Sequence, residues 1–244
     1  RGDQRMICEQ YKFIKLNIKK TGCKSFSFVV PHLDWQHKTW KETQVYIPNI
    51  ADYFIWVNVR NPWERLVSLF FYQKNEMGNS HTDDFDRFIE DLYFSKVHNI
   101  KSYDYDYRSQ WEYISDYKDE LAVDYVCYLP NIVQDFEKIK KRLKFPNEWN
   151  YPHYGGNSHD DYRKYYNPLT IHYVAEMYKK EIEFFEFDFL NRDKFKYPIE
   201  DLEAHPFQQE WRDRLKITIH NQPDRKSTRL NSSHVSESRM PSSA

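Results

Sequence analysis

The sequence contains a short glycine turn flanked by lysines, whose residue types could bind an anion. It reads Lys19-Lys20-Thr21-Gly22-Cys23-Lys24-Ser25, and its glycine is one of only five in 244 residues. Where a helix begins at such a turn, the backbone N–H groups point toward a ligand and favour negative charge. The lysines add mobile positive charges, and the hydroxyls add hydrogen-bond donors. Two interpretations are open at this point: an ordinary solvated turn and a cradle for an anion.

A second pair of residues, Arg60 and Ser68, suits the same chemistry. Arg60 comes at the end of an apolar run, and Ser68 lies two turns into the helix predicted next. Both can face the carboxyl edge of a parallel sheet, where open α/β sheets bind ligands. Arginine is suited to bidentate binding of a phosphate. The structural alternative is an arginine that caps the strand end and a serine bonded to its own helical turn.

Both groups of residues follow stretches that predict β-strands. Residues 11–18 alternate apolar and polar side chains, which is typical of a strand. Residues 53–59 form a near-continuous apolar run, as expected of a strand buried on both faces. A third apolar run, residues 123–129, predicts another strand. Strand, turn and helix repeated in this order predict an α/β fold with a mostly parallel sheet.

Helical spacing of apolar residues follows the predicted strands. Pro62 would lie in the first turn of its helix, where the missing N–H costs nothing, and Asn131 is the expected N-cap of another helix. The turn after Gly22 continues as a helix or as a short extended piece up to Pro31. The predicted helices cover residues 63–75, 85–94, 131–143 and 167–189.

Composition narrows the class of the protein. Apolar residues make up 40% of the chain and aromatic residues 18%, which is enough for a substantial core. The 36 basic and 37 acidic side chains nearly cancel, which argues against a general nucleic-acid coat but allows a local basic pocket. No apolar run approaches the roughly 18–20 residues of a membrane span. The three scattered cysteines, Cys8, Cys23 and Cys127, indicate neither a disulfide framework nor a zinc site.

We expect one domain over residues 1–223 and a tail over residues 224–244. The tail is rich in serine, poor in apolar residues and unpatterned, so we expect it to be disordered. It also resembles translated adaptor or vector sequence, and we expect it to be non-native. The chain starts at Arg1 without a signal segment, and an anchor upstream of Arg1 is compatible with the sequence.

The glycine turn and the Arg60 segment together resemble the sulfotransferases that use 3′-phosphoadenosine-5′-phosphosulfate (PAPS). In that family a strand–loop–helix of the form Pro-Lys-Thr-Gly-Gly-Thr-Ser binds the 5′-phosphosulfate. A second element, Arg-Asn/Asp-Pro followed by Arg-Leu-Val-Ser, binds the 3′-phosphate. Here the second element reads Arg60-Asn61-Pro62-Trp63-Glu64-Arg65-Leu66-Val67-Ser68 and is a close match. The first departs from the pattern at three positions, Lys19 for Pro, Cys23 for Gly and Lys24 for Thr.

The resemblance covers most of residues 11–190 and extends to the carbohydrate branch of the family, which includes Golgi-type and bacterial enzymes. "QHKTWKE" (36–42) resembles the branch's His-x-Thr segment, and "QWEYISD" (110–116) resembles its Gln-x-x-Trp/Tyr-Leu/Ile-Ser-Asp segment. Residues 123–139 and 162–189 are similar to later segments, in the family's order. The resemblance implies a P-loop-like three-layer α/β fold, with a central, mostly parallel sheet flanked by helices.

The resemblance implies two catalytic residues. Lys20 would neutralise the charge that builds on the bridging oxygen of the departing nucleotide. His37, in the segment similar to His-x-Thr, would be the general base for the acceptor hydroxyl, with His32 as the runner-up. The reaction is an in-line transfer of a sulfuryl group, in which positioning and charge stabilisation dominate.

The same resemblance implies a donor site. Arg60 and Ser68 would hold the 3′-phosphate, while Arg163 would either close over the donor or stay a solvated loop charge. A side chain at Cys23 would crowd the 5′-phosphate if the backbone there needs a positive φ. The 5′-phosphate would be held, mainly by backbone N–H groups, by Lys20, Thr21, Gly22, Cys23, Lys24 and Ser25.

The expected partner is a carbohydrate or glycan acceptor, with no nucleic acid and no metal. The cluster at residues 159–161, His-Asp-Asp, is interpreted as solvated loop. Trp35, Trp40, Trp111 and Tyr113 are available for a sugar, although so aromatic a chain buries most such residues. Relatives are Golgi-lumenal and membrane-anchored in animals but soluble in bacteria. A eukaryotic chain would therefore belong to the Golgi lumen or membrane, and a bacterial one to the cytoplasm.

Two other functions compete with carbohydrate sulfation. A nucleotide-dependent phosphotransferase is disfavoured, because the Gly-x4-Gly-Lys-Ser/Thr spacing is missing and no clear magnesium carboxylate follows a strand. A catalytically degenerate, nucleotide-binding relative stays open, because the sequence retains Arg60 and Ser68 but alters the first motif.

Overall fold

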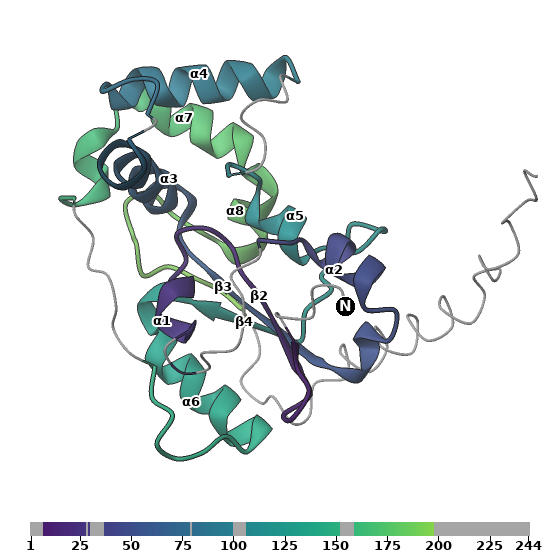
Figure 1. Cartoon of the computed structure of the whole chain (residues 1–244). Helices are drawn as coiled ribbons and strands as arrows, with labels where there is room; N and C mark the ends of the chain where they lie inside the picture. Colours follow the sequence, from purple (N-terminus) through teal and green to yellow (C-terminus); the bar gives the residue numbers. More distant parts are fainter. Residues whose placement is uncertain are drawn as a thin grey trace, which may run out of the picture.

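A four-stranded sheet lies at the centre of the fold (Figure 1). The computed structural model describes residues 7–27, 29, 37–78, 80–99, 106–151 and 159–197, and all structural statements below concern these residues. The strands pair in the order β1-β2-β3-β4, with β2, β3 and β4 parallel and β1 antiparallel to β2. Their bounds are β1 Ile7–Cys8, β2 Phe13–Leu16, β3 Phe54–Val59 and β4 Tyr125–Tyr128. The predicted mostly parallel sheet is confirmed, and the three predicted strands are somewhat shorter than expected.

The central strand β3 has a core on each of its faces because its side chains alternate. Ile55 and Val57 pack into one hydrophobic cluster, whereas Phe54 and Trp56 pack into the other. All six residues of β3 are buried, as its unbroken apolar sequence predicted. The neighbouring strand β2 has one polar residue, Lys15, and its side chain is also buried, with 2% of its surface exposed.

Helices cover both faces of the sheet, so the fold has three layers (Figure 1). One face packs against α1 and α6, which supply Phe26 and Phe136 to its core. The other face packs against α3, whose Leu66 and Phe70 belong to the larger core. The α-helices are α1 Cys23–Ser27, α2 Trp40–Tyr46, α3 Pro62–Tyr72, α4 Phe85–Val97, α5 Gln110–Ile114, α6 Ile132–Leu143, α7 Pro168–Met177 and α8 Lys179–Phe185. Short helical turns are η1 Ile50–Asp52, η2 Gln73–Met77, η4 Leu129–Asn131 and η5 Tyr162–Tyr165.

Two of the local helix predictions can be checked at their caps. Pro62 opens α3 as predicted, and the Asn61 side chain accepts hydrogen bonds from the backbone N–H groups of Trp63 and Glu64 at 3.1 and 3.5 Å. Asn131 occupies the N-cap position of α6, but its side chain makes no capping hydrogen bond. The sequence therefore locates both helix starts and identifies the chemistry of one of them.

The single long helix predicted over 167–189 is wrong, because α7 ends at Met177 and α8 begins at Lys179. Tyr178 breaks the pattern with φ −119° and ψ 22°. Its ring is buried, and its hydroxyl donates to the carbonyl of Tyr107 at 2.8 Å. Packing of this one side chain thus overrides the helical periodicity of the sequence.

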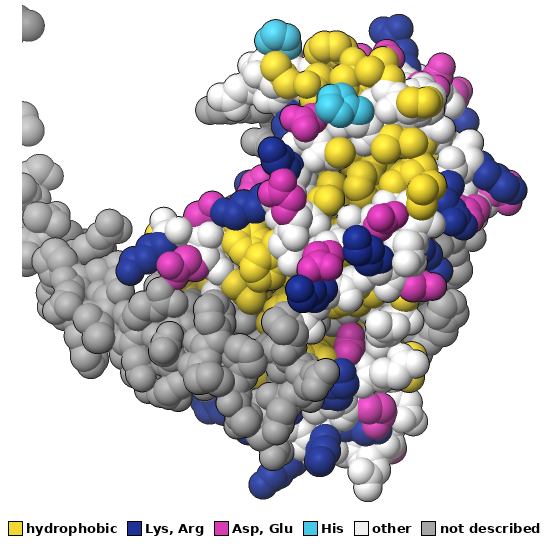
Figure 2. Space-filling model, turned by 180° about the vertical axis from the view of Figure 1, so that it is seen from behind, with side chains coloured by type: hydrophobic (Ala, Val, Ile, Leu, Met, Phe, Trp, Pro, Cys, Tyr) yellow, Lys and Arg dark blue, Asp and Glu magenta, His cyan; other side chains and the backbone are white. Residues whose placement is uncertain are grey.

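The outer surface of the molecule mixes both signs of charge. Figure 2 shows the face opposite to that of Figure 1, with basic and acidic side chains interspersed between apolar patches. This agrees with the near-equal numbers of basic and acidic residues in the sequence. None of the described helices is long and apolar enough to cross a membrane. The predicted tail over 224–244 and the candidates His32 and Trp35 lie outside the described residues.

Candidate active site

The glycine turn between β2 and α1 is held by its carbonyl groups. Four consecutive carbonyls, those of residues 19–22, accept hydrogen bonds from side chains of other parts of the chain. The donors, in order, are Arg65 Nε at 3.2 Å, Arg60 Nη1 at 3.3 Å, Asn58 Nδ2 at 3.1 Å and the Tyr151 hydroxyl at 2.8 Å. In a trans peptide the N–H points opposite to the C=O. The N–H groups of residues 20–23 therefore point away from the side chains that hold these carbonyls, an arrangement compatible with a backbone nest for an anion.

The backbone of this turn requires a glycine at one position only. Gly22 has φ +83°, and a Cβ built there would lie 2.9 Å from Cδ1 of Leu129. Lys20 also has a positive φ, of 65°, which a non-glycine residue adopts at some cost in strain. Cys23 is not among the residues with positive φ. The condition under which its side chain would crowd a phosphate is therefore not met.

The Cys23 side chain turns back into its own loop. Its Sγ lies 2.9 Å from the Ile18 carbonyl, which also accepts from the Thr21 hydroxyl at 2.8 Å. Thr21 is fully buried, so its hydroxyl shapes the loop. Departure from the Gly-Gly pattern at Cys23 thus adds a bond that closes the turn.

Two lysines of the turn flank one aromatic ring. The Nζ atoms of Lys20 and Lys24 lie 4.4 and 5.7 Å from the ring centroid of Tyr72, at the end of α3. Lys24 also pairs with Glu76 at 3.4 Å, an exposed contact of little energetic weight. Burial lowers the pKa of Lys20, and the nearby charge of Arg60 lowers it further, while Glu76 opposes the shift. An anion bound at the turn would favour the charged form of Lys20.

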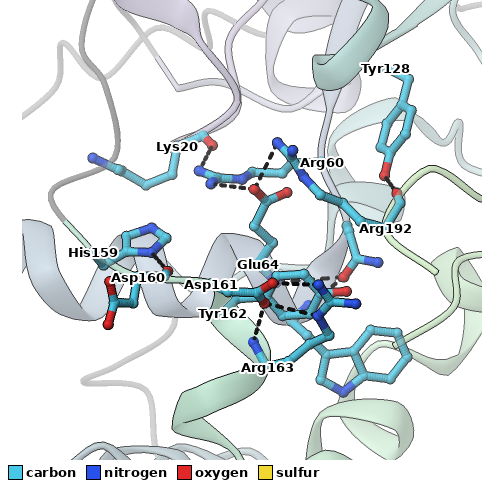
Figure 3. A network of polar contacts seen from close by, with 12 residues as sticks. Lys20, Arg60, Glu64, Tyr128, His159, Asp160, Asp161, Tyr162, Arg163 and Arg192 are labelled. Atoms are coloured by element: carbon cyan, nitrogen blue, oxygen red, sulfur yellow. Dashed lines mark hydrogen bonds and ion pairs between the residues drawn. The ribbon is translucent and has the colours of Figure 1, made fainter. Parts of the chain in front are cut away.

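Arg60 joins the second segment to the turn (Figure 3). Its side chain is buried, with Nη2 3.0 Å from Glu64 Oε1, and Arg192 contacts the same carboxylate oxygen at 3.0 Å. Burial alone would raise the pKa of Glu64, but the two arginines outweigh it and lower that pKa. Glu64 lies four residues after Arg60 in the sequence, and this helical spacing was the signal that could have revealed it.

The backbone of Arg60 is fixed by Gln110, a residue of the segment at 110–116. Gln110 Oε1 accepts from the Arg60 N–H at 2.8 Å, and Gln110 Nε2 donates to the Arg60 carbonyl at 2.8 Å. Gln110 is fully buried and bonds Glu181 of α8 at 2.9 Å. Gln110 therefore fixes the end of the strand, and the Arg60 guanidinium contacts the glycine turn. Phosphate binding by Arg60 stays a prediction.

Ser68 lies one helical turn beyond Glu64 on the same face of α3. It is buried, with 5% of its surface exposed. Arg65, between the two, has a different role. Its guanidinium donates to the carbonyls of Lys19, Asp106 and Arg108 and so braces the loop from behind.

His37 lies beside the end of β2. Its Nδ1 is 2.9 Å from the Asn17 carbonyl. A carbonyl only accepts hydrogen bonds, so Nδ1 carries the proton and Nε2 carries the lone pair of the neutral ring. Burial lowers the pKa of His37, while the bond to Asn17 opposes the shift. Burial therefore favours the neutral ring, and the bond to Asn17 selects the tautomer that a base acting through Nε2 needs.

Arg163, on η5, lies at the surface of the structure. It forms an ion pair with Asp161, and its Nη1 donates to the Leu190 carbonyl at 3.0 Å. The hydrogen bond from Arg163 lowers the pKa of Asp161 to about 2. Closure of Arg163 over a donor stays a prediction.

The neighbouring residue His159 departs from expectation. Asp160 and Asp161 are exposed, as a solvated loop requires, but His159 is half-buried and stacks on Phe71. Its interpretation as a solvated residue is wrong, because the aromatic face of α3 covers its ring. No described group of three or more His, Cys, Asp or Glu residues is close enough to hold a metal ion.

Three of the aromatic candidates for a sugar contact lie in the core instead. Trp40, Trp111 and Tyr113 expose 1%, 6% and 1% of their surface. The three cysteines of the chain are free thiols, in agreement with the sequence.

Fold and site together define a three-layer α/β protein whose glycine turn follows the first parallel strand. The sequence matches the family described as "Sulfotransferase family" over residues 3–188. This match spans most of the chain, and the chain belongs to the sulfotransferase family. The predicted resemblance is confirmed, and with it sulfuryl transfer as the class of reaction.

Comparisons with individual proteins do not identify the acceptor. Among solved structures, the mouse sulfotransferase SULT7A1 complexed with PAP matches with 14% sequence identity and a TM-score of 0.41. The match covers 89% of this chain and 87% of that chain. No curated protein matches the sequence.

Proposed function

We propose that this sulfotransferase moves a sulfuryl group from PAPS to a hydroxyl of a carbohydrate acceptor. One observation carries the donor assignment: Arg60 Nη1 donates to the Lys20 carbonyl at 3.3 Å. This bond joins the two segments that, by family resemblance, bind the two ends of a doubly phosphorylated nucleotide. The acceptor class is supported by the similarity of residues 36–42 and 110–116 to the carbohydrate branch.

The residues present fit such a donor. The outward N–H groups of residues 20–23 suit a 5′-phosphosulfate. Lys20 and Lys24 add charge on the same side of the turn, at the ring of Tyr72. Arg60 is always charged and is held by Glu64 at one nitrogen, which orients the guanidinium for a 3′-phosphate near Ser68.

His37 and Lys20 divide the chemistry between them. The donor supplies the sulfuryl group. His37 Nε2 takes the proton of the acceptor hydroxyl as its oxygen forms the new O–S bond. The S–O bond to the 5′-phosphate breaks, and Lys20 stabilises the negative charge left on that phosphate oxygen. The Asn17 carbonyl keeps the His37 tautomer correct throughout.

The test is a transfer assay with ³⁵S-labelled PAPS and a panel of oligosaccharides. We expect labelled product from the wild type and a loss of about 10²–10³-fold in rate for Lys20→Ala and His37→Ala. Lys138→Ala, on the exposed side of α6, is the matched control and should retain full activity. Nucleotide binding without transfer to any sugar would contradict the proposed activity and favour a degenerate relative. Absence of donor binding would contradict the donor assignment itself.

A further inference from the structure

His159 lies at the edge of the proposed donor site and makes two ring contacts and one hydrogen bond there (Figure 3). Its ring stacks on Phe71 of α3, with centroids 5.7 Å apart and planes at 21°, and meets Tyr165 edge-on at 6.3 Å. Its Nδ1 is 2.7 Å from the carbonyl of Asp160. Since that oxygen only accepts, Nδ1 carries a proton and Nε2 is the nitrogen left to act.

The Nε2 atom of His159 is buried and has no hydrogen-bond partner in the part of the chain that the structure describes. Buried polar atoms of this kind are rare and call for an explanation such as a missing ligand. In Figure 3 the ring lies near the Lys20 side chain, on the same side of the drawn network as Arg60 and Glu64. The charges of these three residues all act on the ring.

The charges around His159 explain what it would bind. Burial lowers its pKa most, and Arg60 and Lys20 lower it further, while the bond to Asp160 and the charge of Glu64 oppose the shift. Among the described residues, the other polar groups near the ring include the Tyr165 hydroxyl, which accepts from the Asp160 N–H, and the exposed Asp160–Lys164 pair. A phosphate placed among Lys20, Arg60 and His159 would reverse the repulsion and favour the imidazolium.

We propose that His159 is a phosphate-binding residue of the donor site, which takes up a proton from solvent when the nucleotide binds. The protonated Nε2 then donates to an anionic oxygen of the nucleotide held by Lys20 and Arg60. This inference rests on the proposed function, because it requires a nucleotide phosphate at that place. It adds a third element, the segment before η5, to the turn and the Arg60 segment.

The experiment is isothermal titration calorimetry with adenosine 3′,5′-bisphosphate, at pH 6 and pH 8, in buffers of different ionisation enthalpy. We expect the wild type to take up protons on binding at pH 8. We expect His159→Gln to bind about tenfold more weakly than the wild type at pH 6, with no such proton uptake. Ionisation of the nucleotide itself affects both proteins equally, so their difference isolates His159. His172→Gln, an exposed histidine on α7, is the matched control and should behave as wild type.

A second variant separates charge from folding. His159→Arg carries a permanent cation, so it should bind the nucleotide at least as tightly as the wild type at pH 8 without taking up a proton. Equal affinity and equal proton uptake in wild type and His159→Gln would overturn the inference while leaving the proposed function intact. Failure of the wild type to bind the nucleotide would overturn both.

Discussion

The glycine turn and the Arg60–Ser68 segment are the two halves of the proposed donor site, and they are built in different ways. In the turn, side chains elsewhere hold four carbonyls, and the backbone itself presents the ligand-binding groups. In the segment, the proposed binding group is a buried guanidinium that Glu64 orients. A site built from backbone tolerates changes of side chain, whereas a site built from side chains does not. This explains why the segment matches the family pattern closely and the turn departs from it at three positions.

Replacing Arg60 should have the largest effect on binding. Arg60→Lys keeps the charge but loses the forked donors, so Glu64 and the Lys20 carbonyl lose a partner. We expect affinity for adenosine 3′,5′-bisphosphate to fall about 10–100-fold. Calorimetry measures the affinity, and Arg142→Lys on α6 is the control. Unchanged affinity would contradict a site built from the guanidinium.

Gly22→Ala tests whether the turn requires a residue without a side chain at position 22. The new Cβ meets Leu129 at 2.9 Å on a backbone with φ +83°, so we expect a loss of about 1–3 kcal/mol in the free energy of unfolding. Gly78→Ala is the matched control, because Gly78 also has a positive φ, of +62°, but nothing lies within 4 Å of its Cβ position. Urea denaturation measures both. If Gly78→Ala destabilises the protein as much as Gly22→Ala does, the contact with Leu129 is not the reason that position 22 requires glycine.

The pH profile of transfer reports on His37. In the proposed mechanism its base form is needed for reaction, and burial lowers the pKa of His37 from the usual 6.5. The rate at saturating substrate should therefore be flat above pH 7 and fall about tenfold per unit of pH below the pKa of His37. His37→Gln should lose this limb together with most of the rate. A wild-type limb with its midpoint above 6.5 would show that another group is the base.

Cys23→Gly should have the smallest effect on nucleotide affinity. It tests whether the turn binds through its backbone, in contrast to the Arg60 segment, which is proposed to bind through a side chain. The change moves the turn toward the family pattern and removes the Sγ contact to the Ile18 carbonyl. We expect nucleotide affinity to change by less than about threefold, because the N–H groups of residues 20–23 stay in place. A large gain or loss in affinity would show that the side chain at this position contacts the phosphate.

The sequence predicted the α/β fold with a mostly parallel sheet well because its signals are local, whereas the three layers were implied by the family resemblance. The apolar run over 53–59 and the cap Asn61-Pro62 fix a buried strand and the start of its helix. The break at Tyr178 was not predictable, since it depends on a hydrogen bond to Tyr107, far away in the chain. The roles of Asn58, Gln110 and Tyr151, which hold the site backbone, were missed for the same reason.

His37 and His159 also show that contacts between residues distant in the sequence could not be predicted. His37 was found through the resemblance of its segment, and the structure adds the tautomer through the Asn17 carbonyl. His159 was assigned to a solvated loop together with Asp160 and Asp161. Its contact with Phe71, which is distant in the sequence, places it near the proposed donor site.

The central claim is that the turn and the Arg60 segment bind the two phosphates of one nucleotide. Calorimetry with adenosine 3′,5′-bisphosphate and adenosine 5′-monophosphate tests it most directly, because the two ligands differ only in the 3′-phosphate. We predict that the wild type binds the bisphosphate at least about tenfold more tightly and that Arg60→Lys loses most of this difference. Equal affinity of the wild type for the two nucleotides would contradict the claim.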